Sequence, residues 1–184
     1  MSSVASSSEQ TITLAGGCFW CVDAAFRTLD GVLDTTCGYA QGDLPRPTYA
    51  DVCGGRTGHA EAVRLRFDPQ RLPLRRVLEV FFAIHDPTSR DRQGADVGPQ
   101  YRSGIYYGDA AQGEQVRALV DALVGAMGPR VVTEVQPLRV FWPAEAEHQD
   151  YYARHPGQGY CQAVIRPKLD AVRSGFAGLL RAPR

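Results

Sequence analysis

The run Gly16-Gly17-Cys18-Phe19-Trp20-Cys21 constrains this chain more than any other stretch of its sequence. It follows residues 11–15, where apolar and hydroxyl side chains alternate as in a β-strand. Apolar residues at helical spacing come next, and Gly31 closes that pattern. Such a junction would place Cys18 at a helix N-terminus, where unpaired N–H groups and the helix dipole favour a thiolate. The sequence therefore predicts a nucleophile at Cys18; the alternative is an inert, buried cysteine.

Length and charge narrow the class of protein. With 184 residues the chain is long enough for one domain with a substantial core. Its 20 basic and 20 acidic residues cancel, which gives no reason to expect a nucleic acid or an anionic membrane as partner. Lys168 is the only lysine, which we attribute to genome composition and not to function.

We expect residues 10–184 to form a single catalytic domain and residues 1–9 to form a disordered tail. The tail is small and polar and lacks the hydrophobic stretch of a signal peptide. No apolar run approaches membrane-spanning length. The five cysteines, an odd number, indicate thiol chemistry and not a disulfide framework. These features favour a cytoplasmic monomer.

The periodicity of apolar residues indicates an α+β fold. Strands are predicted at 11–15, 32–39, 60–67, 101–107, 131–136 and 139–142. Helices are predicted at 19–30, 74–85, 111–127, 144–154 and 168–180, and the acidic residues of the fourth are expected on a solvated face. Loops with glycine and proline at 40–58 and 86–100 are long enough to carry function. We expect a two-layer ferredoxin-like sandwich with a mixed sheet and a loop-rich C-terminal segment.

Two further cysteines are candidates for chemistry. Cys21 completes a C-x-x-C pattern, which is typical of dithiol redox chemistry or of half a zinc site. The other cysteines and histidines form no second pair with metal-type spacing, so we expect no metal. Cys161 follows Gly157 and Gly159 in a segment that looks mobile and could bring a second thiol to Cys18. The alternative for Cys161 is a packed loop cysteine.

An acidic residue shares the apolar face of a predicted strand. In residues 61–67, Glu61 has the same alternation as Val63, Leu65 and Phe67. Burial would raise the pKa of its carboxyl group, which could then hold and donate a proton near neutral pH. The alternative is a solvated Glu61 just ahead of the buried part of the strand.

Further motifs follow the Gly-Gly-Cys-Phe-Trp run in a fixed order. They are Gly38-Tyr39, Pro47-Thr48-Tyr49, Val52-Cys53, Thr57-Gly58-His59-Ala60-Glu61, His85-Asp86-Pro87-Thr88, Arg92-Gln93-Gly94, Gln100-Tyr101-Arg102-Ser103 and Tyr160-Cys161. Together they resemble the class A peptide methionine sulfoxide reductases, from about Leu14 to Lys168. So many matches in one order make coincidence implausible.

The resemblance implies reduction of the S epimer of methionine sulfoxide, free or in proteins, as repair of oxidative damage. Cys18 would attack the sulfoxide sulfur and become a sulfenic acid, while Glu61 would protonate the sulfoxide oxygen. A second thiol would then form an intramolecular disulfide, which thioredoxin or dithiothreitol would reduce. No metal or organic cofactor is implied.

The resemblance also implies the substrate-binding residues. Phe19 and Trp20 would form a pocket for the substrate methyl group. Tyr49 and Tyr101 would donate hydrogen bonds to the sulfoxide oxygen; either could instead be a rim or core aromatic. Asp96 would organise the site through water.

The chain departs from the family pattern at three places. Cys21 stands where many members have glycine, so two thiols could resolve the sulfenic acid. Cys161 matches the family's C-terminal resolving position and is the first choice, because Cys21 reaches disulfide geometry with Cys18 only through local unwinding. No cysteine follows Cys161, which argues against a relay to the tail. Ala95 and Val97 replace the usual asparagine and histidine, which leaves the partners of Asp96 open.

Two other functions remain to be weighed. A general dithiol–disulfide oxidoreductase would use Cys18 and Cys21 and would need neither Glu61 nor the tyrosines. A zinc-stabilised binding module would hold one metal ion per chain.

Overall fold

The central sheet has the strand order of a ferredoxin-like fold. The computed structural model describes residues 9–183, so the predicted tail lies outside the described residues except for Glu9. The repeated β-α-β-β-α-β unit consists of β1 (Gln10–Gly16), α1 (Phe19–Arg27), β2 (Val32–Ala40), β3 (Ala60–Phe67), α3 (Leu74–Ala83) and β6 (Ser103–Tyr107). Its strands are ordered β6-β1-β3-β2, and each neighbouring pair is antiparallel.

Two further strands lie at the edges of the sheet, and one of them, β7 (Glu134–Pro137), makes it mixed, as predicted. β7 runs parallel to β6, and β8 (Phe141–Pro143) runs antiparallel to β2. The remaining elements are α2 (Tyr49–Cys53), the hairpin strands β4 (Arg92–Gln93) and β5 (Asp96–Val97), α4 (Ala110–Val124), α5 (Tyr151–Arg154) and α6 (Arg166–Gly175). Single helical turns lie at Pro99–Tyr101, Gly125–Arg130, Ala146–His148, Cys161–Ile165 and Ala177–Leu179, of which Cys161–Ile165 is π-helical. Helix α2, inside the predicted loop 40–58, was not expected.

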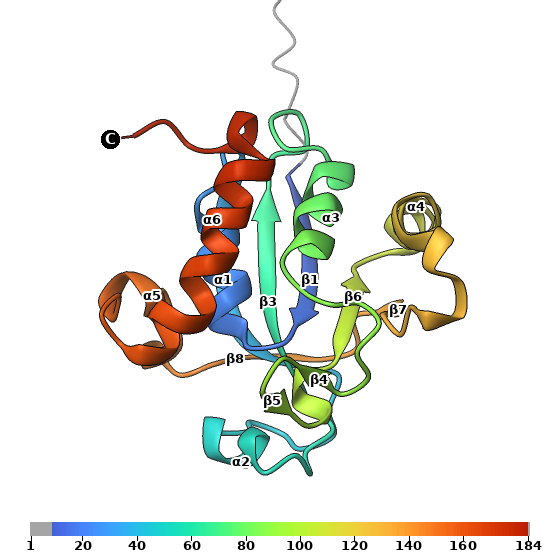
Figure 1. Cartoon of the computed structure of the whole chain (residues 1–184). Helices are drawn as coiled ribbons and strands as arrows, with labels where there is room; N and C mark the ends of the chain where they lie inside the picture. Colours follow the sequence, from blue (N-terminus) through green and yellow to red (C-terminus); the bar gives the residue numbers. More distant parts are fainter. Residues whose placement is uncertain (1–8, 184) are drawn as a thin grey trace, which may run out of the picture.

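The helices α1, α3 and α6 cover one face of the sheet (Figure 1). Alternation along β1 and β3 directs Ile12 and Leu14, and Val63 and Leu65, into this layer, where all four are at most 1% exposed. Figure 1 also shows α2 and the β4–β5 hairpin at the end of the sheet where β1 finishes. Residues from distant parts of the sequence therefore gather at that end.

The predicted helix 144–154 is wrong. Ala146–His148 forms a single 3-10 turn, Asp150 adopts the left-handed conformation with φ of 50°, and only Tyr151–Arg154 is α-helical. Of the acidic residues expected on a solvated face, Glu147 is exposed, whereas the expectation is wrong for Glu145. The Glu145 carboxylate accepts hydrogen bonds from the Tyr39 hydroxyl at 2.8 Å and from the Tyr49 N–H at 3.0 Å. Periodicity alone could not reveal these partners, which lie about 100 residues away.

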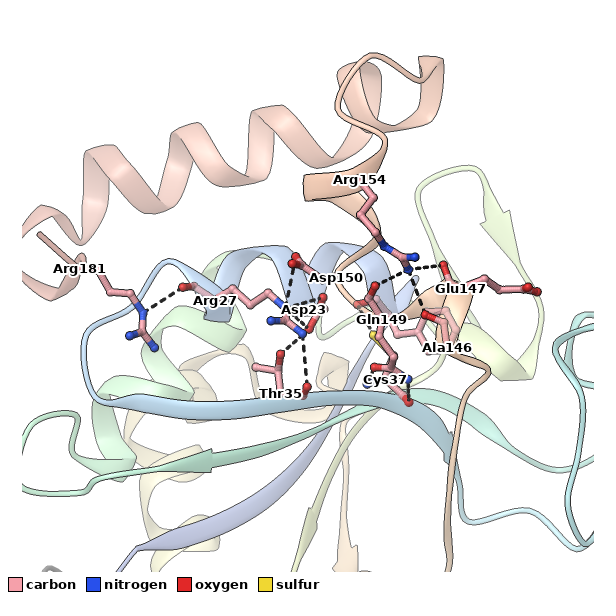
Figure 2. Close-up of polar contacts among 11 residues, drawn as sticks. Asp23, Arg27, Thr35, Cys37, Ala146, Glu147, Gln149, Asp150, Arg154 and Arg181 are labelled. Atoms are coloured by element: carbon pink, nitrogen blue, oxygen red, sulfur yellow. Dashed lines mark hydrogen bonds and ion pairs between the residues drawn. The ribbon is translucent and has the colours of Figure 1, made fainter. Parts of the chain in front are cut away.

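Side chains of this segment bind the backbone of β2 and of the segment itself (Figure 2). Gln149 accepts the Cys37 N–H at 2.8 Å and donates to the Cys37 carbonyl at 2.9 Å, much as a neighbouring strand would. Arg154 donates to the carbonyls of Ala146, Glu147 and Gln149. These bonds favour a fixed, irregular path over a regular helix.

A buried carboxylate ties α1 to β2 and to the same segment (Figure 2). Asp23 is 1% exposed and accepts hydrogen bonds from Arg27 at 3.0 Å and from the Thr35 hydroxyl at 2.6 Å. Arg27 also lies 3.5 Å from the Asp150 carboxylate. The network therefore holds the segment that follows β8 against helix α1.

No helix in residues 9–183 is both long and apolar enough to cross a membrane.

Replacing Gln149 tests how much these bonds stabilise the fold. In Gln149→Leu the buried Cys37 N–H loses its partner, whereas the Cys37 carbonyl keeps its bond from Ala144. Because an unpaired buried N–H costs about 1–3 kcal/mol, we expect the free energy of unfolding to fall by that amount. Urea denaturation followed by circular dichroism measures it. Gln115→Leu, the same change at an exposed position of α4, is the control and should lose less than about 0.5 kcal/mol. Equal losses in the two variants would contradict this account.

Candidate active site

The turn between β1 and α1 places Cys18 at the N-cap of α1. Gly17 has φ of 88°, a conformation that favours glycine, and a Cβ atom there would lie 2.8 Å from the Gln93 side chain. The Cys18 carbonyl accepts the Cys21 N–H at 3.1 Å, which begins the helix. The predicted strand–turn–helix junction is thus confirmed. The residue Cys18 is 8% exposed.

An aromatic cluster lies beside Cys18. Phe19 is fully buried, and its ring centroid lies 6.4 Å from that of Trp20 and 6.2 Å from that of Tyr49. Tyr151 stacks on Trp20 with centroids 3.8 Å apart. The indole Nε1 of Trp20 is buried and has no hydrogen-bond partner among the described residues. This surface suits a small apolar group with a polar atom beside it.

His148 completes the aromatic cluster and is a residue that sequence reasoning did not place there. Its ring centroid lies 4.2 Å from that of Tyr49, and the side chain is buried. The tyrosine is therefore held on two sides, by Glu145 at its backbone and by His148 at its ring.

Glu61 faces the helix layer, as the alternation predicted. It is 2% exposed, and its Oε2 has no hydrogen-bond partner among the described residues. Burial raises the pKa of this carboxyl group well above its ordinary value, and the negative charge of Asp96 adds to the effect. A hydrogen bond from the backbone of Phe19 opposes the shift. Burial therefore favours the protonated form of Glu61, whose Oε2 is unpaired among the described residues.

Tyr49 and Tyr101 face the same carboxyl group. The pKa of each hydroxyl is raised, first by burial and next by the charge of Glu61. Tyr49 begins α2, and Tyr101 ends the turn before β6. Both hydroxyls are hydrogen-bond donors at neutral pH, beside an acid and near Cys18.

The structure identifies a hydrogen-bond partner of Asp96, which the sequence could not. Its Oδ2 accepts a hydrogen bond from the Tyr160 hydroxyl at 2.7 Å, and the same hydroxyl lies 3.9 Å from the Cys21 sulfur. Tyr160 thus bridges the β4–β5 hairpin and helix α1. Sequence reasoning did not single out Tyr160, although it directly precedes Cys161.

The two thiols at the start of α1 influence each other's pKa. Burial, followed by contact with Cys21 and the charge of Glu61, raises the pKa of the Cys18 thiol well above its ordinary value. The pKa of Cys21 is lowered, chiefly by a hydrogen bond from Cys18. Burial therefore opposes the effect of the helix N-terminus at Cys18, and the two thiols titrate as a pair.

A cavity of about 420 Å³ opens beside these thiols. Cys18, Cys21, Asp96, Tyr160 and Lys168 contribute to its wall, together with the end of α3. Lys168 is the third residue that the sequence analysis missed, and its being the only lysine was the one available signal.

Cys161 does not reach Cys18 in this conformation. It starts the π-helical turn Cys161–Ile165, is fully buried, and does not line the cavity. The mobile-looking segment predicted around it is thus a packed turn at the cysteine itself. All five cysteines are free thiols, and Cys37 is buried.

Among residues 9–183, one group of side chains has the spacing of a metal site. It consists of Glu145, Glu147 and His148, whose ligand atoms lie within 4.8 Å of one another. This group contains no cysteine, whereas the zinc-stabilised module considered above would bind its metal through cysteines.

Comparison with known proteins identifies the family. The model of the peptide methionine sulfoxide reductase family matches residues 10–178. The chain is 52% identical to peptide methionine sulfoxide reductase MsrA of Thermus thermophilus over 173 residues, which covers 94% of this chain and 98% of that protein. It is 49% identical to the MsrA of Clavibacter michiganensis, with 94% and 99% covered.

Solved structures agree with this assignment. Reduced Mxr1 of Saccharomyces cerevisiae matches with a TM-score of 0.78 and 35% identity over 83% of this chain and 89% of that one. Methionine sulfoxide reductase A of Corynebacterium diphtheriae matches with a TM-score of 0.76 and 35% identity, over 86% and 80%. Mxr1 in complex with Trx2 matches with a TM-score of 0.56 and 25% identity, over 82% and 90%. The chain belongs to the peptide methionine sulfoxide reductase family.

Proposed function

We propose that this chain reduces the S epimer of methionine sulfoxide, free and in proteins, to methionine. Cys18 is the nucleophile, Glu61 the acid, and thioredoxin the reductant that restores the thiols, as the complex of Mxr1 with Trx2 suggests. The reaction needs no metal or organic cofactor. We place the protein in the cytoplasm, where it repairs oxidised methionine.

The observation that carries the proposal is the buried, unpartnered oxygen of Glu61 near a buried thiol. A sulfoxide is a poor electrophile until its oxygen gains a proton. The raised pKa of Glu61 keeps that proton available, and Tyr49 and Tyr101 supply further donors to the same oxygen. The acid and the nucleophile therefore meet where a sulfoxide can bridge them.

The first step transfers the oxygen atom. The Cys18 sulfur attacks the sulfoxide sulfur while Glu61 protonates the oxygen. The oxygen then passes to Cys18, which becomes a sulfenic acid, and methionine leaves. The methyl group rests on Phe19 and Trp20, and Asp96 orders the site through Tyr160.

The second step closes a disulfide. A thiol attacks the sulfenic sulfur of Cys18, a sulfur–sulfur bond forms and water leaves. Cys161 and Cys21 are the two candidates for this thiol. Reduction of the disulfide by thioredoxin returns both cysteines to their thiols.

The contact between Cys18 and Cys21 also supports a second candidate, a dithiol–disulfide oxidoreductase. Thiol–disulfide exchange would not require the buried acid Glu61. With dithiothreitol as reductant, we expect turnover of methyl p-tolyl sulfoxide and none of a simple disulfide substrate. The reverse pattern would favour the oxidoreductase.

Removing the nucleophile should stop the first step. We expect Cys18→Ser to give no methyl p-tolyl sulfide, because a hydroxyl at that position cannot form the sulfenic acid. Chromatography of a single turnover without reductant measures the product. Circular dichroism should show a native fold in the variant. Sulfide at the level of the unaltered chain would remove Cys18 from the mechanism.

Replacing the acid should slow the same step. We expect Glu61→Gln, which keeps the size of the side chain, to lower the single-turnover rate by about 10²–10⁴-fold. In the unaltered chain the rate should fall as pH rises through the raised pKa of Glu61, because the carboxyl group loses its proton there. Glu61→Gln should lack that alkaline fall. A rate unchanged by the substitution would exclude Glu61 as the acid.

A further inference from the structure

Three side chains that can bind a metal ion lie together in the turn that follows β8. Glu145, Glu147 and His148 each offer one ligand atom, and these atoms lie within 4.8 Å of one another. The His148 Nε2 lies 3.7 Å from the Glu147 carboxylate, which is too far for a hydrogen bond. Two ligands of a tetrahedral zinc ion, each about 2.0–2.2 Å from the metal, lie about 3.3–3.6 Å apart. The spacing of this pair is therefore close to that of two ligands of one ion.

The ring of His148 carries polar atoms that no described residue satisfies. The residue is 6% exposed, and neither of its ring nitrogens has a hydrogen-bond partner among the described residues. Buried polar groups are nearly always hydrogen-bonded, so an exception calls for an explanation. A neutral imidazole nitrogen is also the commonest protein ligand of metal ions. The unpaired nitrogen that faces Glu147 thus points to a ligand independently of the two carboxylates.

Contacts outside the group hold two of the three ligands in place. The Glu145 carboxylate accepts hydrogen bonds from the Tyr39 hydroxyl and the Tyr49 N–H, one at each oxygen, which leaves each oxygen a further lone pair. The ring of His148 packs against those of Tyr49 and Phe19, with centroids 4.2 and 5.7 Å away. Ligands that are fixed by their own neighbours are favourable for metal binding. Glu145 and His148 are therefore preorganised.

Glu147 supplies the third ligand from the solvent side. Its side chain is 77% exposed, so it can close onto an ion that arrives from water and shorten the longer distances in the group. The neighbouring cation is Arg154, whose guanidinium donates to three backbone carbonyls of the same turn. The two carboxylates and this one guanidinium sum to a charge of −1, which favours the approach of a cation.

The kinds of donor atom select the class of ion. Calcium and magnesium take oxygen ligands, whereas imidazole suits zinc and its neighbours in the first transition row. One imidazole nitrogen with two carboxylate oxygens matches a zinc ion that has three protein ligands and a fourth position for water.

We propose that Glu145, Glu147 and His148 form a binding site for zinc or a neighbouring first-row divalent ion. Glu145 binds the backbone of Tyr49, and His148 packs against its ring. An ion held by both residues therefore fastens the turn after β8 to α2 and stabilises this wall of the aromatic cluster. The ion takes no part in the reaction proposed above, and the site does not depend on that function.

The test uses Co²⁺ as the probe, because its absorption spectrum distinguishes nitrogen and oxygen ligands from thiolates. This distinction matters because Cys18 and Cys21 are free thiols in the same chain. Co²⁺ is titrated into the reduced full chain without added thiol, by calorimetry and by absorption. We expect one ion per chain without the near-ultraviolet band of thiolate-bound cobalt. At an ion concentration about 100 times Kd, the midpoint of thermal unfolding should rise by about 5–10 °C.

Glu147→Gln is the main variant, because it removes one ligand and keeps the size of an exposed side chain. It should weaken Co²⁺ binding at least about tenfold and remove the thermal shift at the same ion concentration. His148→Gln should weaken binding likewise. Glu114→Gln, the same change at an exposed position of α4, is the matched control and should bind Co²⁺ as the unaltered chain does.

Three results would each overturn the site. They are binding only with the thiolate band, no binding up to about 1 mM Co²⁺, and equal affinity in Glu147→Gln and the unaltered chain. Circular dichroism checks the fold of each variant. If the buried change His148→Gln prevents folding, the exposed change Glu147→Gln still decides the outcome.

Discussion

The left-handed turn at Gly17 is the constraint on which the site depends. It ends β1 and starts α1 within two residues, so that Cys18 caps the helix at the end of a central strand. The Gln93 side chain packs where a Cβ of residue 17 would lie, and its amide bonds the backbone N–H and carbonyl of Asp86 at 2.9 and 2.6 Å. The loop that carries Asp96 is therefore fixed to the turn that carries Cys18. A side chain at position 17 would disturb both at once.

Burial favours the protonated form of both the acid and the thiols, which helps the acid and hinders the nucleophile. It raises the pKa of Glu61, which keeps a proton for the sulfoxide oxygen. It also raises the pKa of Cys18, which opposes formation of the nucleophile. Cys21 acts against this effect within the pair, because contact with Cys18 lowers its pKa.

Local patterns predicted the parts of the structure that depend on local interactions. Alternation of side chains placed Glu61 on the buried face, and the glycine pair predicted the junction at Cys18. The helix expected at 144–154 failed because Gln149 bonds to Cys37, 112 residues away, and Glu145 bonds to Tyr39. The partner of Asp96 was equally out of reach, since Tyr160 lies 64 residues further along the chain. Periodicity carries no information about such pairs.

The two chemical steps need opposite protonation states within one buried region. Glu61 must keep a proton for the first step, and a thiol must lose one for the second. Burial and the charge of Asp96 favour the protonated form of Glu61. Cys18 and Cys21 line a cavity that Glu61 does not line. The acid and the thiols therefore have different surroundings within one buried region, which allows the site to supply first an acid and then a thiol.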